Sequence, residues 1–482
     1  MTWDGNHEGG LQLATAIRDG RISAVEVLRA SLKRAEDFRH LGAIRYFAAD
    51  LALAEAERID RERAAGRPGG GAFAGVPFLM KDLGTRVKGF PTVCGSRAII
   101  RRTGPAFTDD DLAARFRAAR FVIFGMSTAP EFGMTFTSEP PIGPVARSPL
   151  DVRLTPGGSS GGAAAAVSAG IVALAHANDA AGSIRVPAAC CGLVGLKPSR
   201  GATPPGPDFN NYNSGIVGNF VLTRTLDDAA AMLDGVTGKS RGPHPDPLIG
   251  PALASLSRPV PALRVGVVQD LPAGLPFDGS RRDAVGHAAA ALRRAGHKLV
   301  PVEPSALADI IDLSGLAAGR VLCANLARML GELDPPLGFE EIEPLTRAAL
   351  TFGQSLTGSE LVEAEMAIGR AAGLLASLFD DNDVLLTPML SSPPPAVGAY
   401  PTDHGDLDHH RRRSFALAPY AGFSNVTGTP TLTVPHGRDG AGLPLPVQLI
   451  GPIGCDVLLL RLARVLRAVE PWGFGSRIAG LD

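Results

Sequence analysis

Apolar segments alternate with helical segments along much of this chain, and this alternation limits the folds that it can adopt. Leu263–Val268 and His297–Val302 have the composition of buried strands, and Arg281–Ala295 between them has the apolar spacing of a helix. A strand, a helix and a second strand in this order are typical of a sheet with helices packed on its faces. We therefore predict an α/β fold with a mixed, mostly parallel central sheet that helices cover on both faces.

Further strand and helix signals occur throughout the sequence. Helical spacing is found within residues 10–66, at Gly161–Ala169 and at Asp456–Val469. The remaining strand-like segments are Gly75–Leu79, Phe121–Phe124, Ile171–Ala175, Val384–Leu386, Thr431–Val434 and Val447–Ile450. Because no internal repeat and no linker separates these segments, we predict one domain over residues 1–482.

The composition excludes several classes of partner. The 47 Lys and Arg residues balance the 48 Asp and Glu residues, so the net charge of −1 gives no attraction to nucleic acid or to an anionic membrane.

The five cysteines are scattered and odd in number, which favours free thiols in a reducing compartment. The chain starts without a leader pattern, and residues 161–177 are mostly Ala and Gly, short of a membrane span. We therefore expect a cytoplasmic protein.

The segment Gly157–Gly162, with the sequence GGSSGG, places Ser159 between glycines. It satisfies the G-x-S-x-G pattern in which a serine nucleophile occupies a sharp strand-to-helix turn. A glycine-rich phosphate loop and a simple tight turn before a helix are the alternatives. The P-loop pattern is absent, which argues against phosphate binding.

Ser183 is a second candidate nucleophile. It follows the small residues Ala180, Ala181 and Gly182, whose backbone N–H groups could converge on one oxyanion. The alternative is an exposed turn that leads into a strand-like segment at Ile184–Val186. From these residues alone, neither serine is decisive.

Lys81 is the candidate base. It lies in the apolar segment GVPFLMKD, and an amine acts as a base only when it is neutral. Burial lowers the pKa of a lysine from about 10.4, by about 3 units or more at a buried site. A surface lysine with no chemical role is the alternative.

Together these three segments resemble the amidase signature family of Ser–cis-Ser–Lys hydrolases. The resemblance includes GVPFLMKD, GGSSGG and GSIRVPAACCGLVGLKPSRG, and it extends to STAPEFG and SNVTGTPTLTVPHG, so it covers almost the whole chain. The interval of 24 residues between Ser159 and Ser183 also agrees with that family.

The resemblance assigns a role to each candidate. It implies that Ser183 is the acylated nucleophile and that Lys81 is the base. Ser159, which a cis peptide bond joins to Gly158, would relay protons between them. The N–H groups of Ala180, Ala181, Gly182 and Ser183 would form the oxyanion hole. Gly158, Ser160, Asp179 and Arg185 would support the site structurally. No metal and no organic cofactor is implied.

The resemblance also divides the domain into N-terminal helices over 10–66, a catalytic core over about 70–235 and a C-terminal part with substrate loops over about 260–475. Loops near 204–216, 310–330 and 390–410, together with Cys323, are expected to shape the leaving-group side. The run His409–Arg413 is expected to be solvated.

One departure from the family lies beside the nucleophile. The family commonly has two glycines before it, whereas this chain has Ala181 and Gly182. A side chain at position 181 would be strained if the backbone needed a positive φ.

The substrate is expected to be a small non-peptide amide, because the sequence resembles the branch that hydrolyses 6-aminohexanoate cyclic dimers. Hydrolysis of carbamates or aryl amides by the same three residues is one alternative. A glutamine-amidotransferase subunit and a catalytically silent binding protein are the others. The expected partner is a small-molecule amide, with no nucleic acid and no membrane, and a homodimer is an open alternative.

Overall fold

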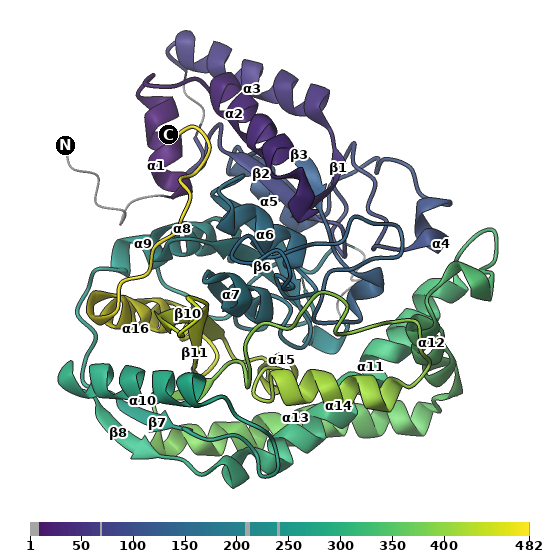
Figure 1. The fold of residues 1–482 in the computed structure, drawn as a ribbon, viewed down its shortest axis with the longest axis vertical. Coiled ribbons are helices and arrows are strands. Elements are labelled where there is room, and N and C mark those ends of the chain that lie inside the picture. The colour runs from purple at the N-terminus through teal and green to yellow at the C-terminus, as the bar shows by residue number, and fades with distance from the viewer. Residues whose placement is uncertain (1–8, 68–69, 208–212, 239–241, 482) are drawn as a thin grey trace.

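A single sheet runs through the molecule, as shown by a computed structural model that describes residues 9–67, 70–207, 213–238 and 242–481 (Figure 1). Within these residues the sheet has eleven strands. In spatial order they are β1 (Ile44–Phe47), β3 (Val122–Ser127), β2 (Pro77–Lys81), β4 (Leu174–Asp179), β6 (Gly218–Thr223), β5 (Val194–Lys197), β10 (Thr431–Arg438), β11 (Pro444–Ile450), β9 (Val384–Pro388), β7 (Arg264–Val267) and β8 (Lys298–Pro301).

The sheet is mixed, as predicted, but it is not mostly parallel. Among the described strands, β2–β3, β2–β4, β7–β8 and β7–β9 are parallel pairs, and the other six neighbouring pairs are antiparallel. Parallel strands are recognised in a sequence by apolar runs without alternation, because helices bury both of their faces. The antiparallel strand β11 is buried at every residue as well, so its sequence looks the same as that of a parallel strand.

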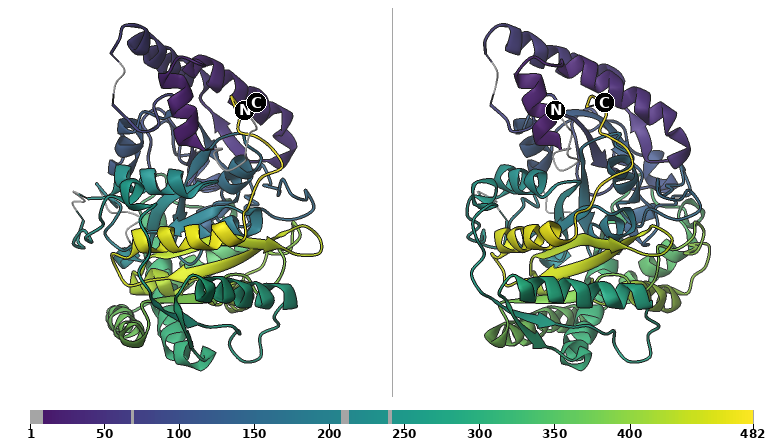
Figure 2. Two further views of the ribbon diagram at one scale, coloured as in Figure 1. Left: turned by 90° about the vertical axis from the view of Figure 1, so that its left-hand side faces the viewer. Right: turned by 60° about the vertical axis from the view of Figure 1, so that its left-hand side comes forward.

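Helices cover both faces of the sheet, which confirms that part of the prediction. Successive side chains of a strand point to opposite faces, and every residue of β2, β3, β4, β5, β9 and β11 is buried. In one example, α10 and α16 lie side by side over β10 and β11 (Figure 2).

Sixteen α-helices occur in the described residues. They are α1 (Gly10–Arg18), α2 (Ala24–Asp37), α3 (Ala49–Ala64), α4 (Arg97–Ile100), α5 (Asp111–Ala118), α6 (Gly161–Ser168), α7 (Arg185–Cys191), α8 (Leu226–Val236), α9 (Ala252–Ser255), α10 (Gly279–Arg294), α11 (Ala308–Gly331), α12 (Pro344–Ser355), α13 (Gly358–Asp381), α14 (Leu407–Leu417), α15 (Phe423–Thr427) and α16 (Asp456–Val469). No helix among the described residues is long and apolar enough to cross a membrane.

Two groups of helices lie at opposite ends of the molecule in Figure 1. The N-terminal helices α2 and α3 pack against each other and against β2 and β3. At the other end, α11 packs against α12, α13 and α15. Residues 310–330 are therefore part of a long helix, which corrects the expectation of a loop there. Of the expected loop at 204–216, residues 208–212 lie outside the described residues.

Candidate active site

Lys81 is buried at the C-terminal end of β2, which lies between β3 and β4. Its Nζ atom lies 2.8 Å from Ser159 Oγ and 2.6 Å from Asn178 Oδ1. Burial lowers the pKa of Lys81 from 10.5 to about 7, although the nearby Asp179 carboxylate opposes the change. A substantial fraction of the amine is thus neutral near pH 7, and the amine lies within hydrogen-bond distance of a hydroxyl, as a general base requires.

Ser159 lies in the glycine-rich segment directly before α6, and the peptide bond from Gly158 is cis. A side chain at Gly158 would come within 2.3 Å of Thr137 O, so only glycine fits this close approach. The neighbouring Ser138 also holds the segment, since its Oγ accepts the N–H of Gly161 at 2.9 Å. Ser160 donates to Asn178 O at 3.2 Å. These bonds fix Ser159 opposite Lys81.

Ser183 lies in the turn between β4 and α7, where Ser183 and Ile184 are buried while Ala180 and Ala181 are half-buried. The alternative of an exposed turn before a strand is therefore wrong, because α7 begins at Arg185. Gly182 has a φ of +134°, and a side chain there would also approach the Cβ of Ala421 at 3.0 Å. Ala181 is not among the described residues with a positive φ, so the condition under which its side chain would be strained is not met.

The oxyanion donors need one correction. The N–H of Gly182 donates to Asp179 Oδ1 at 2.6 Å, so it is not directed at a substrate. Over the described residues, the N–H groups of Ala180, Ala181 and Ser183 donate no hydrogen bond. These three groups remain the candidates for an oxyanion hole. The direction of each N–H depends on the turn geometry, which small residues alone do not specify.

A fully buried ion pair supports the turn. Asp179 Oδ2 accepts from Arg185 Nε at 2.9 Å and from the N–H of Ile184 at 3.1 Å. Arg185 also donates to Asn425 Oδ1 and to Gln448 Oε1, at 2.6 and 3.1 Å. Burial alone would raise the pKa of Asp179, but the Arg185 guanidinium holds it at about 2. The carboxylate therefore stays ionised and fixes both ends of the turn.

Asn178 and His176 also contact Lys81, although they were not among the residues predicted from the sequence. Both lie on β4 in alternate positions, so their side chains share one face of the strand and meet the end of β2. His176 Nδ1 accepts the backbone N–H of Lys81 at 3.2 Å, while Asn178 Nδ2 donates to Leu83 O at 3.0 Å. The polar pattern HAND within an otherwise apolar strand was the signal that could have revealed them.

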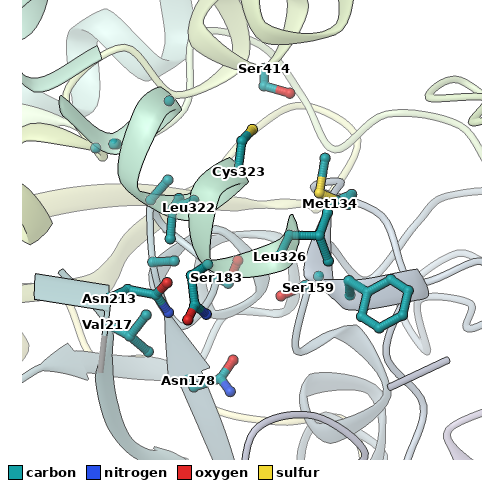
Figure 3. A pocket seen from close by; sticks show the side chains of 18 of the residues that line it. Met134, Ser159, Asn178, Ser183, Asn213, Val217, Leu322, Cys323, Leu326 and Ser414 are labelled. Atoms are coloured by element: carbon teal, nitrogen blue, oxygen red, sulfur yellow. The ribbon is translucent and has the colours of Figure 1, made fainter. Parts of the chain in front are cut away.

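The site opens into a cavity of about 820 Å³. Ser159, Asn178 and Ser183 line it, whereas Lys81 lies behind Ser159 and is not part of the wall. Figure 3 shows Asn213 and Val217 on one side of Ser183, Ser159 and Met134 on the other, and Leu322, Cys323 and Leu326 of α11 above them. Cys323 therefore borders the cavity, as expected, but from a helix.

The run His409–Arg413 is not simply solvated. It lies in α14, where His410 is only 4% exposed and its Nε2 lies 3.1 Å from Met134 O. Burial lowers the pKa of His410 to about 4, so the imidazole is neutral. Arg411 and Arg412 line the cavity. The prediction treated the charged run as one exposed surface. Neighbouring residues of a helix point to different sides, so one of them can be buried while the others are exposed.

The family follows from comparison with known proteins. A model of the amidase family matches residues 26–460. The chain therefore belongs to the amidase family, and it is a hydrolase that acts on amide carbon–nitrogen bonds. In sequence it is similar to the 6-aminohexanoate-cyclic-dimer hydrolase of Paenarthrobacter ureafaciens, with 32% identity over 480 residues that cover 95% of this chain and 94% of that protein.

Solved structures agree with this family. A 6-aminohexanoate cyclic dimer hydrolase complexed with substrate superposes with a TM-score of 0.90 and 29% identity, covering 98% of this chain and 99% of that one. A bacterial aryl acylamidase of the amidase signature family superposes with a TM-score of 0.83 and covers 97% of both chains. At 24% identity this second likeness concerns the fold alone. The predicted family and α/β fold are confirmed.

Proposed function

We propose that this amidase hydrolyses small non-peptide amides through an acyl-enzyme on Ser183. The observation that carries the proposal is the buried pair of Lys81 and Ser159, 2.8 Å apart, with a lysine pKa of about 7. Ser159 and Ser183 line the same cavity, and the proposed relay requires Ser159 Oγ to take the proton of Ser183 Oγ and to pass its own proton to Lys81 Nζ.

In the first half of the reaction, Ser183 Oγ attacks the carbonyl carbon of the amide. The proton of Ser183 moves to Ser159 Oγ, and the proton of Ser159 moves to neutral Lys81 Nζ. The N–H groups of Ala180, Ala181 and Ser183 then hold the oxyanion. Each donor of this kind is worth about 10²–10³ in rate.

In the second half, the tetrahedral intermediate collapses and the carbon–nitrogen bond breaks. The protonated Lys81 returns its proton through Ser159 to the departing nitrogen, so the product leaves as an amine. Water then attacks the acyl group on Ser183 and gives its proton to the same relay, which restores the hydroxyl. The sum is the addition of one water molecule to the amide.

The similar 6-aminohexanoate-cyclic-dimer hydrolase supports the choice of substrate class. We propose 6-aminohexanoate-type amides, cyclic or linear, as the first compounds to assay. The mostly apolar wall around the serines, including Leu322, Leu326 and Val217, suits an aliphatic chain.

The experiment compares Ser183→Ala with the wild type on a simple aryl amide. Removing the nucleophile should lower kcat/KM by at least about 10⁴-fold while the protein stays folded. Ser377→Ala, on the exposed face of α13, is the matched control and should keep full activity. A Ser183→Ala enzyme that retains a tenth of the wild-type rate would overturn the assignment.

A further inference from the structure

Two residues that line the cavity, Asn213 and Ser314, each have a polar side-chain atom that is buried without a hydrogen-bond partner among the described residues. The two atoms are Asn213 Oδ1 and Ser314 Oγ. A buried polar atom without a partner costs about 1–3 kcal/mol. Such atoms are uncommon in native proteins, and each calls for a reason. A ligand group that pairs with them supplies that reason.

The backbone turn that carries Asn213 is held in place on both sides. Asn213 and the following Ser214 have φ values of +44° and +52°, in the left-handed region that asparagine tolerates better than most residues. Ser214 Oγ donates to Glu365 Oε1 at 2.5 Å, and Asn425 Nδ2 donates to Ile216 O at 3.1 Å. Figure 3 shows the Asn213 carboxamide directed toward Ser183.

Ser314 lies in α11 and is only 3% exposed. A helical serine commonly satisfies its hydroxyl by bonding to a carbonyl one turn earlier, yet the Ser314 hydroxyl makes no such bond. The turn at Asn213 packs against α11, so the two groups come from neighbouring elements. The cavity around them is mostly apolar, with Val217, Leu322 and Phe423 in its wall.

We propose that Asn213 and Ser314 bind a second amide group of the substrate, which an apolar chain separates from the amide that is cleaved. A carboxamide accepts through its oxygen and donates through its nitrogen, so another amide complements it, and a serine hydroxyl can do either. This inference rests on the proposed function, and it narrows the substrate class to diamides and longer oligomers of aliphatic amide units.

The selectivity follows from the cost of leaving the two atoms unpaired. An amide whose chain lacks the second polar group fills the cavity with methylene groups and leaves Asn213 Oδ1 and Ser314 Oγ without partners. A site built to pair with a polar group rejects an analogue without that group more strongly than an apolar pocket rejects a longer chain.

The experiment uses two anilides with acyl chains of equal length, one with an amide in mid-chain and one all-carbon. A second pair carries the same two chains on the amine side. For at least one pair, the wild type should prefer the amide-bearing probe in kcat/KM by about tenfold or more, which corresponds to about 1.4 kcal/mol. A wild type with no preference in either pair would overturn the inference.

Asn213→Ala and Ser314→Ala should each bring that ratio close to one, whereas Ser377→Ala should leave it unchanged. Ser314→Ala removes an unpaired buried hydroxyl, so its unfolding temperature should stay the same or rise. Variants that keep the preference would overturn the inference even if Ser183→Ala is inactive. The failure of this subsite is therefore distinguishable from the failure of the acyl-enzyme proposal.

Discussion

The two walls of the cavity are built on different principles. The catalytic wall contains Ser159, Asn178 and Ser183, and hydrogen bonds of 2.6–3.1 Å hold it to the buried Lys81 and Asp179 behind it. The opposite wall consists of side chains from α11 and α14, such as Leu322 and Arg411, and it includes the unpaired hydroxyl of Ser314. We infer that the sheet and its turns fix the chemistry, while α11 and α14, together with the turn at Asn213, select the substrate.

Lys81→Met should give the largest effect, because it removes the base that lies behind the catalytic wall. We expect kcat/KM for an aryl amide to fall by about 10³-fold or more. The methionine keeps the apolar volume, so circular dichroism should show a folded protein. If Lys81→Met loses less than tenfold, the catalytic wall does not work through this amine.

Asp179→Asn should destabilise the fold, because it leaves the Arg185 guanidinium buried without an anion. Breaking a buried pair of this kind costs about 3–5 kcal/mol in the free energy of unfolding, measurable by chemical denaturation. On the opposite wall, Arg411 and Asp408 are 3.8 Å apart and partly exposed, so Asp408→Asn should cost less than about 1 kcal/mol. If Asp179→Asn and Asp408→Asn lose equal free energies of unfolding, the two walls do not differ in the way described here.

The pH dependence should report on Lys81. Only the neutral amine accepts a proton, so kcat/KM should rise with pH up to about 7 and then level off. Asn178→Asp places a carboxylate beside Lys81 Nζ and favours the charged amine. The rising part of the pH profile should therefore move to higher pH by about 1–3 units. If the rising part of the pH profile stays at the same pH in Asn178→Asp, Lys81 is not the titrating base.

Leu322→Ala, on the opposite wall, should give the smallest effect. We expect kcat/KM for a long aliphatic amide to fall by about tenfold relative to a short one, because the substitution removes apolar contact with the chain. The rising part of the pH profile should not move. A change that is the same for both substrates would assign Leu322 to the chemistry instead.

Much of the fold was predictable from local patterns. The last helix, α16, has the predicted bounds Asp456–Val469, and β9 and β11 begin within three residues of their predicted starts. These segments carry clear periodicity or uninterrupted apolar runs. By contrast, α11 contains Gly315 and Gly319, each of which lowers helix propensity by about 1 kcal/mol relative to alanine. Packing against α12 and α13 overrides that cost, which local reasoning could not foresee.

The candidate site was predictable as a set of residues but not as a geometry. The resemblance brought together Lys81, Ser159 and Ser183, and the structure places the first two in direct contact. It did not reveal that Asp179 takes the N–H of Gly182, or that Asn178 contacts the amine. The pattern HAND could have marked Asn178 as a polar residue in a strand, but no short pattern encodes the pairing of β4 with β2 or the direction of each N–H in the turn.

The most direct test of the account is the intact mass of the enzyme, quenched during turnover of an amide, followed by peptide mapping. We predict a mass increase equal to the acyl group, located on the peptide that contains Ser183 and absent from Ser183→Ala. Consumption of the amide with an adduct on Ser159, or with no adduct on any serine under rapid quench, would contradict it.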